Sequence, residues 1–157
     1  MLTPPGSTSG GLLKLGAHLL TAWSSTQKVV ALSSGESEYY SLVRCACEAI
    51  GLAGVLREIG MVLTIDLWTD ATVVRSIATR VGQGGGRIKH MDTKYLWLQQ
   101  KVQLKELSVN KIKGLFKGAD LMTKGLDSKT MTKHCESMCV TLEGGRHHSA
   151  PQLSIPA

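Results

Sequence analysis

A long helical pattern, from Ser34 to about Ile59, constrains the fold more than any other feature of this sequence. Apolar side chains recur along it at helical spacing, and Gly60 is a plausible stop signal. An apolar stripe of that length must be covered by another layer of structure. We therefore expect the helix to pack against a sheet. The stripe consists of Leu42, Ala46, Ala49, Ala53 and Leu56.

The segments on either side of this helix predict the strands of that sheet. Residues 12–24 read as a hairpin that turns at Gly16, and residues 27–33 as extended chain. After the helix, the pattern predicts a strand over 61–70, helices over 71–80 and 90–103, a strand over 107–113 and a short helix over 118–126. This order predicts an α/β domain, a mixed sheet with helices on its faces.

The chain has 157 residues, which suits one domain with a substantial core. We expect a flexible leader at 1–10, the folded domain at 11–127, a helical extension at 128–143 and a disordered tail at 144–157. No apolar run reaches the length of a membrane span, and the N-terminus has no signal-peptide pattern. These features predict an intracellular protein, in a cytoplasmic particle or the nucleus, without a membrane partner.

Basic residues are concentrated in the second half of the chain. Residues 75–133 carry thirteen Lys/Arg against four Asp/Glu, whereas residues 1–74 carry four against six. Such a block is typical of a protein that contacts a polyanion such as nucleic acid. A solvated, lysine-rich face would give the same composition.

Two glutamates near the start of the long helix have different predicted roles. Ser33 and Glu36 have the spacing of a capping box, which gives Glu36 a structural role. Glu38 instead begins the stripe that continues through Leu42 and Cys45, so it should face the sheet. A carboxylate there is costly unless it is paired or bound to a cation. The alternative is an acidic first turn favoured by the helix dipole.

Two aspartates are further candidates for a metal site. Asp70 closes a predicted strand, and Asp120 follows the strand predicted at 107–113. Each is also explained as a helix cap. Convergence of several carboxylates would favour Mg²⁺, which prefers oxygen ligands and can activate water for phosphodiester hydrolysis.

Four blocks of sequence together resemble the ribonuclease H domain of copia-type retrotransposon Pol polyproteins. They appear in the family's order and at its spacing, between about residues 7 and 126. The blocks are WSSTQKVVALSSGESEYYSLV, LWTDATVVRSIA, IKHMDTKYLWLQ and KGADLMTKGL. The resemblance implies a ribonuclease H-like fold that cleaves the RNA strand of RNA–DNA hybrids with two Mg²⁺ ions (Mn²⁺ being a possible substitute) and four acidic residues. It also implies a reverse transcriptase domain as partner in the parent polyprotein and no small-molecule substrate.

By position, the resemblance implies that Glu38, Asp70 and Asp120 are the catalytic, metal-binding carboxylates. Asp92 falls in a family block that we assign to positioning or substrate contact. The basic candidates for contact with the nucleic-acid backbone are Arg87, Lys89, His90, Lys94, Lys111, Lys113 and Lys117.

The sequence departs from the family at its beginning. The first family Asp precedes the STSGG segment, which stands here at residues 7–11, and residues 1–35 contain no Asp or Glu. The first strand of the sheet is therefore expected to be missing, as in an N-terminally truncated domain. In addition, LFKGAD replaces the family stretch before Asp120. This leaves two hypotheses: an impaired ribonuclease H, or a catalytically inactive remnant that binds nucleic acid non-specifically or acts as a scaffold.

The chain also has four cysteines, which could bind a metal or form disulfides: Cys45, Cys47, Cys135 and Cys139. Without a secretory context we expect free thiols. A zinc site built on His134, Cys135 and Cys139 is the weaker alternative.

Overall fold

The computed structural model describes residues 8–27, 31, 33–80 and 97–141. Over these residues the chain has a mixed α/β architecture, as the sequence predicts, but its strands form two separate small sheets. One is an antiparallel hairpin of β1 (Thr8–Leu15) and β2 (His18–Thr26), and the other is a parallel pair of β3 (Asp66–Thr69) and β4 (Ser108–Lys111). The single mixed sheet expected from the sequence is therefore wrong for the described residues.

The hairpin extends further than its apolar residues predict. Thr8 pairs with Thr26 and Leu15 with His18, and Gly16 occupies the turn with a φ of +59°. Gly at this position permits the left-handed conformation that the turn requires. The prediction of a flexible leader over residues 1–10 is wrong for residues 8–10, because these residues belong to β1 and Ser9 is buried.

The long helix, α1 (Ser34–Glu58), begins and ends within one residue of its predicted bounds. The Ser33 hydroxyl accepts a hydrogen bond from the Glu36 backbone N–H at 3.2 Å, which confirms Ser33 as its N-cap. By length and composition α1 is apolar enough to cross a membrane, and 28% of its most apolar window is buried. A core helix of a soluble domain passes the same test, so this composition alone does not identify a membrane protein.

The other helices of the described residues are short. They are α2 (Thr72–Ala78), α3 (Trp97–Gln103), η2 (Gly114–Phe116), η3 (Gly118–Met122) and α4 (Ser128–Ser137). The helix expected over 118–126 is a 3-10 helix that ends at Met122. Of the helix predicted at 90–103, the part before Trp97 lies outside the described residues. The tail expected at 144–157 lies wholly outside them.

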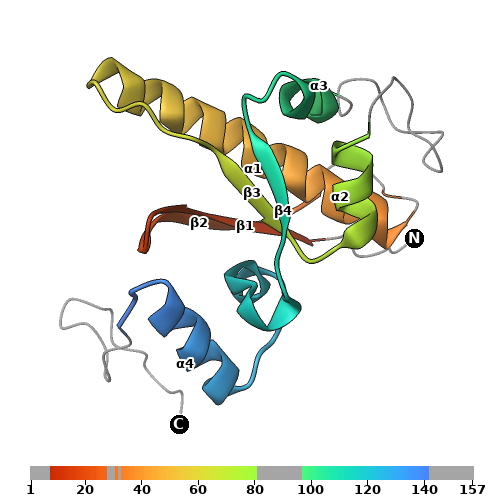
Figure 1. Cartoon of the computed structure of the whole chain (residues 1–157). Helices are drawn as coiled ribbons and strands as arrows, with labels where there is room; N and C mark the ends of the chain where they lie inside the picture. Colours follow the sequence, from red (N-terminus) through yellow and green to blue (C-terminus); the bar gives the residue numbers. More distant parts are fainter. Residues whose placement is uncertain (1–7, 28–30, 32, 81–96, 142–157) are drawn as a thin grey trace, which may run out of the picture.

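The hydrophobic core lies on one side of the molecule. It joins α1 to β3, β4, α2 and α3, and neither strand of the hairpin contributes a member. Figure 1 shows the hairpin and these elements on different sides of α1. Tyr39, Val74 and Leu98 are its largest fully buried side chains. The β1–β2 hairpin and η3 therefore form a second part that contacts α1 separately.

Glycines allow the hairpin to approach its neighbours closely. A Cβ on Gly11 would lie 2.3 Å from a Trp23 ring carbon and 2.8 Å from the Cys45 Sγ. A Cβ on Gly10 would lie 2.6 Å from the Thr123 methyl carbon. Side chains at either position would push β1 away from α1 or from the segment around η3.

Candidate functional site

Asp70 lies at the carboxyl end of β3 and is held by a lysine rather than by a helix terminus. The N-cap of α2 is Ala71, which makes no side-chain capping bond. The Asp70 carboxylate instead accepts a hydrogen bond from Lys117 Nζ at 2.6 Å. The capping explanation of Asp70 is therefore wrong.

Asp120 lies inside η3 and is 8% exposed. Its Oδ2 accepts a hydrogen bond from Lys124 Nζ at 2.7 Å, and its Oδ1 lies 3.8 Å from Lys117 Nζ. Within the described part of the chain, that Oδ1 is buried without a hydrogen-bond partner. The residue that precedes η3 is Lys117, so Asp120 does not cap this helix either.

Glu36 and Glu38 have different surroundings in the structure. Glu36 is buried and accepts a hydrogen bond from the Tyr40 hydroxyl, in addition to its backbone contact with Ser33. Glu38 faces the groove that also contains Asp70 and Asp120, and its Oε2 is buried without a hydrogen-bond partner among the described residues. Of these two glutamates, Glu38 is therefore the one that lines the groove, whereas Glu36 is engaged by Tyr40.

Two lysines connect the three carboxylates electrostatically. A hydrogen bond to Asp120 raises the pKa of Lys124; partial burial opposes this, and the charges of Asp120, Asp70 and Glu38 add to it. Burial alone would raise the pKa of Asp70, but the hydrogen bond and charge of Lys117 outweigh it and lower that pKa below 3.8. Residues far apart in sequence thus share one electrostatic site.

The carboxylates of this site are not arranged as a ready ligand set for a metal ion. No group of three His, Cys, Asp or Glu side chains positioned for a metal occurs among the described residues. However, Glu38 and Asp120 each present a buried oxygen without a hydrogen bond, and an ammonium lies between Asp70 and Asp120. A divalent ion shared by these two aspartates would replace the Lys117 ammonium.

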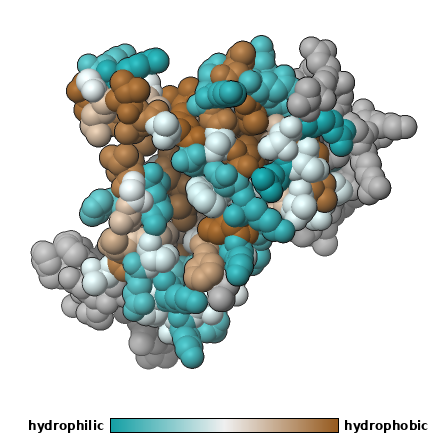
Figure 2. All heavy atoms as spheres, viewed as in Figure 1, coloured by the Kyte–Doolittle hydropathy of each residue, from teal (hydrophilic) through white to brown (hydrophobic). Residues whose placement is uncertain are grey.

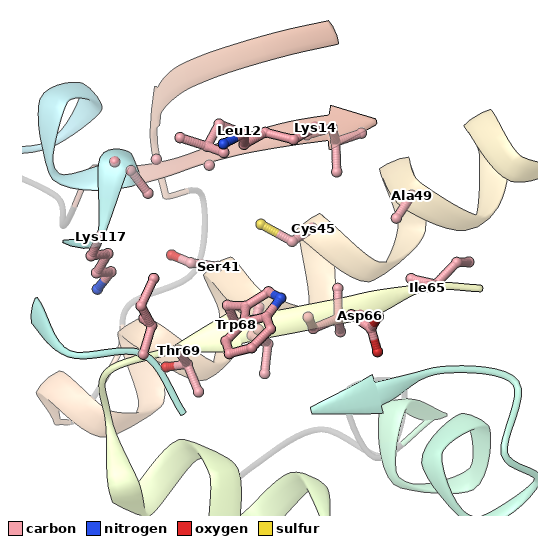
Figure 3. A pocket seen from close by; sticks show the side chains of 18 of the residues that line it. Leu12, Lys14, Ser41, Cys45, Ala49, Ile65, Asp66, Trp68, Thr69 and Lys117 are labelled. Atoms are coloured by element: carbon pink, nitrogen blue, oxygen red, sulfur yellow. The ribbon is translucent and has the colours of Figure 1, made fainter. Parts of the chain in front are cut away.

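The carboxylates lie at one end of a groove of about 1040 Å³. Its walls are β1 and β3, and its floor is one face of α1 (Figure 3). Figure 3 shows Lys117 near the carboxyl end of β3, close to Thr69, with Ser41 and Cys45 of α1 between the two strands. The opposite end of the groove is apolar and includes Leu15, Leu56 and Val62.

The basic residues chosen from the sequence have different surroundings. Lys111 and Lys113 are exposed, and Lys111 Nζ donates a hydrogen bond to Thr72 Oγ1 at 3.0 Å. Lys117 is engaged by the carboxylates. Lys124 is a site residue that sequence reasoning missed; its position four residues after Asp120 in a helical pattern was the available signal. Arg87, Lys89, His90 and Lys94, like Asp92, lie outside the described residues.

The alternative zinc residues are not arranged as a metal site. His134 and Cys135 are buried, whereas Cys139 is exposed. Within the described part of the chain, these three side chains do not form a group that could hold a metal ion. All four cysteines have free thiols, as expected.

Fold and site together define a mixed α/β domain with a carboxylate–lysine cluster at the end of a groove. Its sequence is similar to retrovirus-related Pol polyproteins of plant transposons. It is 29% identical over 119 residues (75% of this chain) to the one from transposon TNT 1-94 of Nicotiana tabacum, and 28% identical over 138 residues (86% of this chain) to the one from transposon RE1 of Arabidopsis thaliana. The matched region is 9% of the length of each relative. No protein-family model matches the chain, and no solved structure matches it.

Proposed function

We propose that this chain is a retrotransposon-derived, ribonuclease H-like domain whose site hydrolyses the RNA strand of RNA–DNA hybrids. One observation carries the proposal: Glu38, Asp70 and Asp120, separated by long stretches of sequence, line one end of a single groove and share Lys124 as an electrostatic neighbour. The similarity to Pol polyproteins supports a retrotransposon origin.

In this proposal the three carboxylates hold Mg²⁺, or Mn²⁺ in its place. The ion would supply an activated water and charge stabilisation for phosphodiester hydrolysis. Asp70 and Asp120 would bind it after Lys117 withdraws, and Glu38 would contribute its unpaired oxygen. Because residues 1–35 supply no fourth carboxylate, we expect cleavage by the chain to be weak.

Basic residues near the site would hold the backbone of the hybrid. Lys111 is the last residue of β4 and Lys113 follows this strand, at the end of the parallel pair where Asp70 follows β3. Arg87, Lys89, His90 and Lys94 remain candidates from the sequence. We expect little dependence on base sequence, because A-form duplexes are read through shape, phosphates and 2′-hydroxyls. In the parent polyprotein, the reverse transcriptase domain would be a further partner.

Replacing Asp70 by Asn tests the catalytic assignment. Asp70→Asn removes one metal-binding charge, so we expect it to abolish cleavage of a labelled RNA–DNA hybrid in Mg²⁺ and in Mn²⁺ while hybrid binding is retained. Glu48→Gln is the matched control, because Glu48 is a half-exposed carboxylate on α1 outside the groove. Equal cleavage by Asp70→Asn and the wild type would disprove the assignment.

The alternative is a domain that has lost catalysis and binds nucleic acid non-specifically. Lys117 favours this alternative, because its ammonium already neutralises Asp70 and lies near Asp120. If folded wild-type protein binds hybrid but cleaves nothing with either metal ion, this alternative replaces the catalytic one.

A further inference from the structure

We propose that the groove between the two sheets binds an extended, largely apolar peptide segment, which adds a β-strand between β1 and β3. This inference does not depend on nuclease activity. It rests on the strand edges, on the floor of the groove and on the chemistry that each would recognise.

The edges of β1 and β3 face the groove. It is lined by every residue from Gly10 to Gly16 and from Val62 to Asp70. Consecutive residues of a strand point to opposite faces, so a cavity lined by all of them must run along the strand edges. Figure 3 shows β1, which carries Leu12 and Lys14, opposite β3, which carries Asp66, Trp68 and Thr69.

These edges have unused hydrogen-bonding capacity. In the described part of the chain, β1 pairs only with β2 and β3 only with β4. No backbone hydrogen bond joins β1 to β3 there. An added strand would satisfy both edges at once, which is the basis of peptide recognition by strand addition. Since β1 and β3 run in opposite directions (Figure 3), the added strand would be parallel to one and antiparallel to the other.

The floor of the groove specifies an apolar ligand with large side chains. α1 presents small residues there, Cys45, Ala49 and Ala53, between Leu42 and Leu56. Phe116, Gly118 and Ala119 line the groove from the segment around η3. A strand covered on both faces is typically a continuous run of Val, Ile and Leu. Seven residues would match the seven lining positions from Gly10 to Gly16.

The surface around the groove is also apolar. Figure 2 shows hydrophobic atoms gathered in the hollow between the distal end of α1 and the hairpin. Val55, Ile59 and Val62 are each more than half exposed, and Leu20 is 45% exposed. A lipid surface would cover such atoms, but it would leave the N–H and C=O groups of both edges unsatisfied. A peptide strand covers the atoms and pairs the edges.

Binding of a synthetic peptide to the full chain tests the proposal. The probe has seven alternating Val and Ile residues flanked by lysines, and the control peptide has proline at the central position, which removes a ladder N–H. By fluorescence anisotropy we expect the proline peptide to bind at least about tenfold more weakly. Hydrogen exchange should slow at amides of β1 and β3. Equal affinity of the two peptides would overturn the proposal.

Two cysteines on α1 provide an internal control for the location of binding. Cys45 lines the groove, whereas Cys47 is exposed and lies outside it. Burial raises the pKa of Cys45 to about 11. In variants that keep one of the two thiols, bound peptide should slow alkylation of Cys45 and leave that of Cys47 unchanged. Slowing at both or at neither would contradict binding in the groove.

A pair of lysine substitutions distinguishes the groove from the rest of the helix. Ala49→Lys places a charge on the groove floor, whereas Val55→Lys changes a 61% exposed side chain outside the lining. We expect only Ala49→Lys to lose peptide binding, with circular dichroism showing that both variants fold. If the chain dimerises and Ala49→Lys removes the dimer, the occupant of the groove is a second copy and the proposal is overturned. If the chain binds phosphatidylcholine vesicles and Ala49→Lys removes that binding, the occupant is a membrane and the proposal is likewise overturned.

Discussion

At the scale of single residues, the site is organised by Lys117. Its ammonium lies 2.6 Å from Asp70 Oδ1 and 3.8 Å from Asp120 Oδ1, so one positive charge serves two carboxylates. Asp120 also forms an ion pair with Lys124. Among the contacts of the described residues, neither lysine lies within hydrogen-bonding distance of Glu38. The two lysines offset the cost of placing the carboxylates of Asp70 and Asp120 in one groove, because unpaired buried charges are strongly destabilising.

Replacing Lys117 by Met should change the acid stability of the protein. In the wild type, Asp70 has a folded-state pKa below its unfolded value of 3.8. Its contribution to stability is therefore present above pH 3.8 and is lost as the pH falls through the folded-state pKa. In Lys117→Met the lysine no longer offsets burial, so the pKa of Asp70 should rise and this contribution should shrink.

The measurements for Lys117→Met are a carboxyl ¹³C titration of Asp70 by NMR and urea unfolding across the acid range. Lys129→Met, which removes an exposed lysine from α4, should behave like the wild type. An unchanged Asp70 titration in Lys117→Met would show that the Lys117–Asp70 contact does not control this carboxylate.

At the scale of secondary structure, local rules place the start of α1 correctly. Ser33→Ala should destabilise the protein by about 1 kcal/mol, because it removes the oxygen that accepts the Glu36 N–H. Ser34→Ala is the control, since the neighbouring Ser34 is already within the helix. Urea unfolding measures both, and a similar loss in the two variants would contradict the assignment of the cap.

Two glycines should respond to alanine in opposite directions. At Gly11 a Cβ would meet the Trp23 ring and Cys45 Sγ, so Gly11→Ala should destabilise the hairpin and its contact with α1. At Gly51, inside α1, a Cβ would meet nothing within 4 Å. Gly51→Ala should therefore stabilise by up to about 1 kcal/mol, because Ala has the higher helix propensity.

Thermal unfolding of these two glycine variants gives the comparison directly. The midpoint should fall for Gly11→Ala and rise for Gly51→Ala. A rise in both would mean that β1 moves away from α1 at little cost, and that the close approach at Gly11 is not important for stability.

At the scale of the whole molecule, the chain has a net charge of +6 and its basic residues gather in the second half of the sequence. The proposed binding of RNA–DNA hybrid should weaken steeply with salt, because phosphate contacts release counterions. Lys113→Ala should reduce the slope of log affinity against log salt by about 1 if Lys113 contacts a phosphate. Lys129→Ala should leave the slope unchanged. Affinity that is constant between low and high salt would exclude backbone binding by this surface.

The sequence by itself determined the order of the elements, the bounds of α1, its N-cap Ser33 and the turn at Gly16. These features depend on local periodicity, capping and backbone freedom, which neighbouring residues specify. Only the tertiary structure decided that Lys117 and Lys124 neutralise the carboxylates, that neither Asp70 nor Asp120 caps a helix, and that β1 and β3 stand apart across a groove. Such facts depend on contacts between residues distant in sequence, and a single sequence encodes those contacts only through the packing of the whole chain.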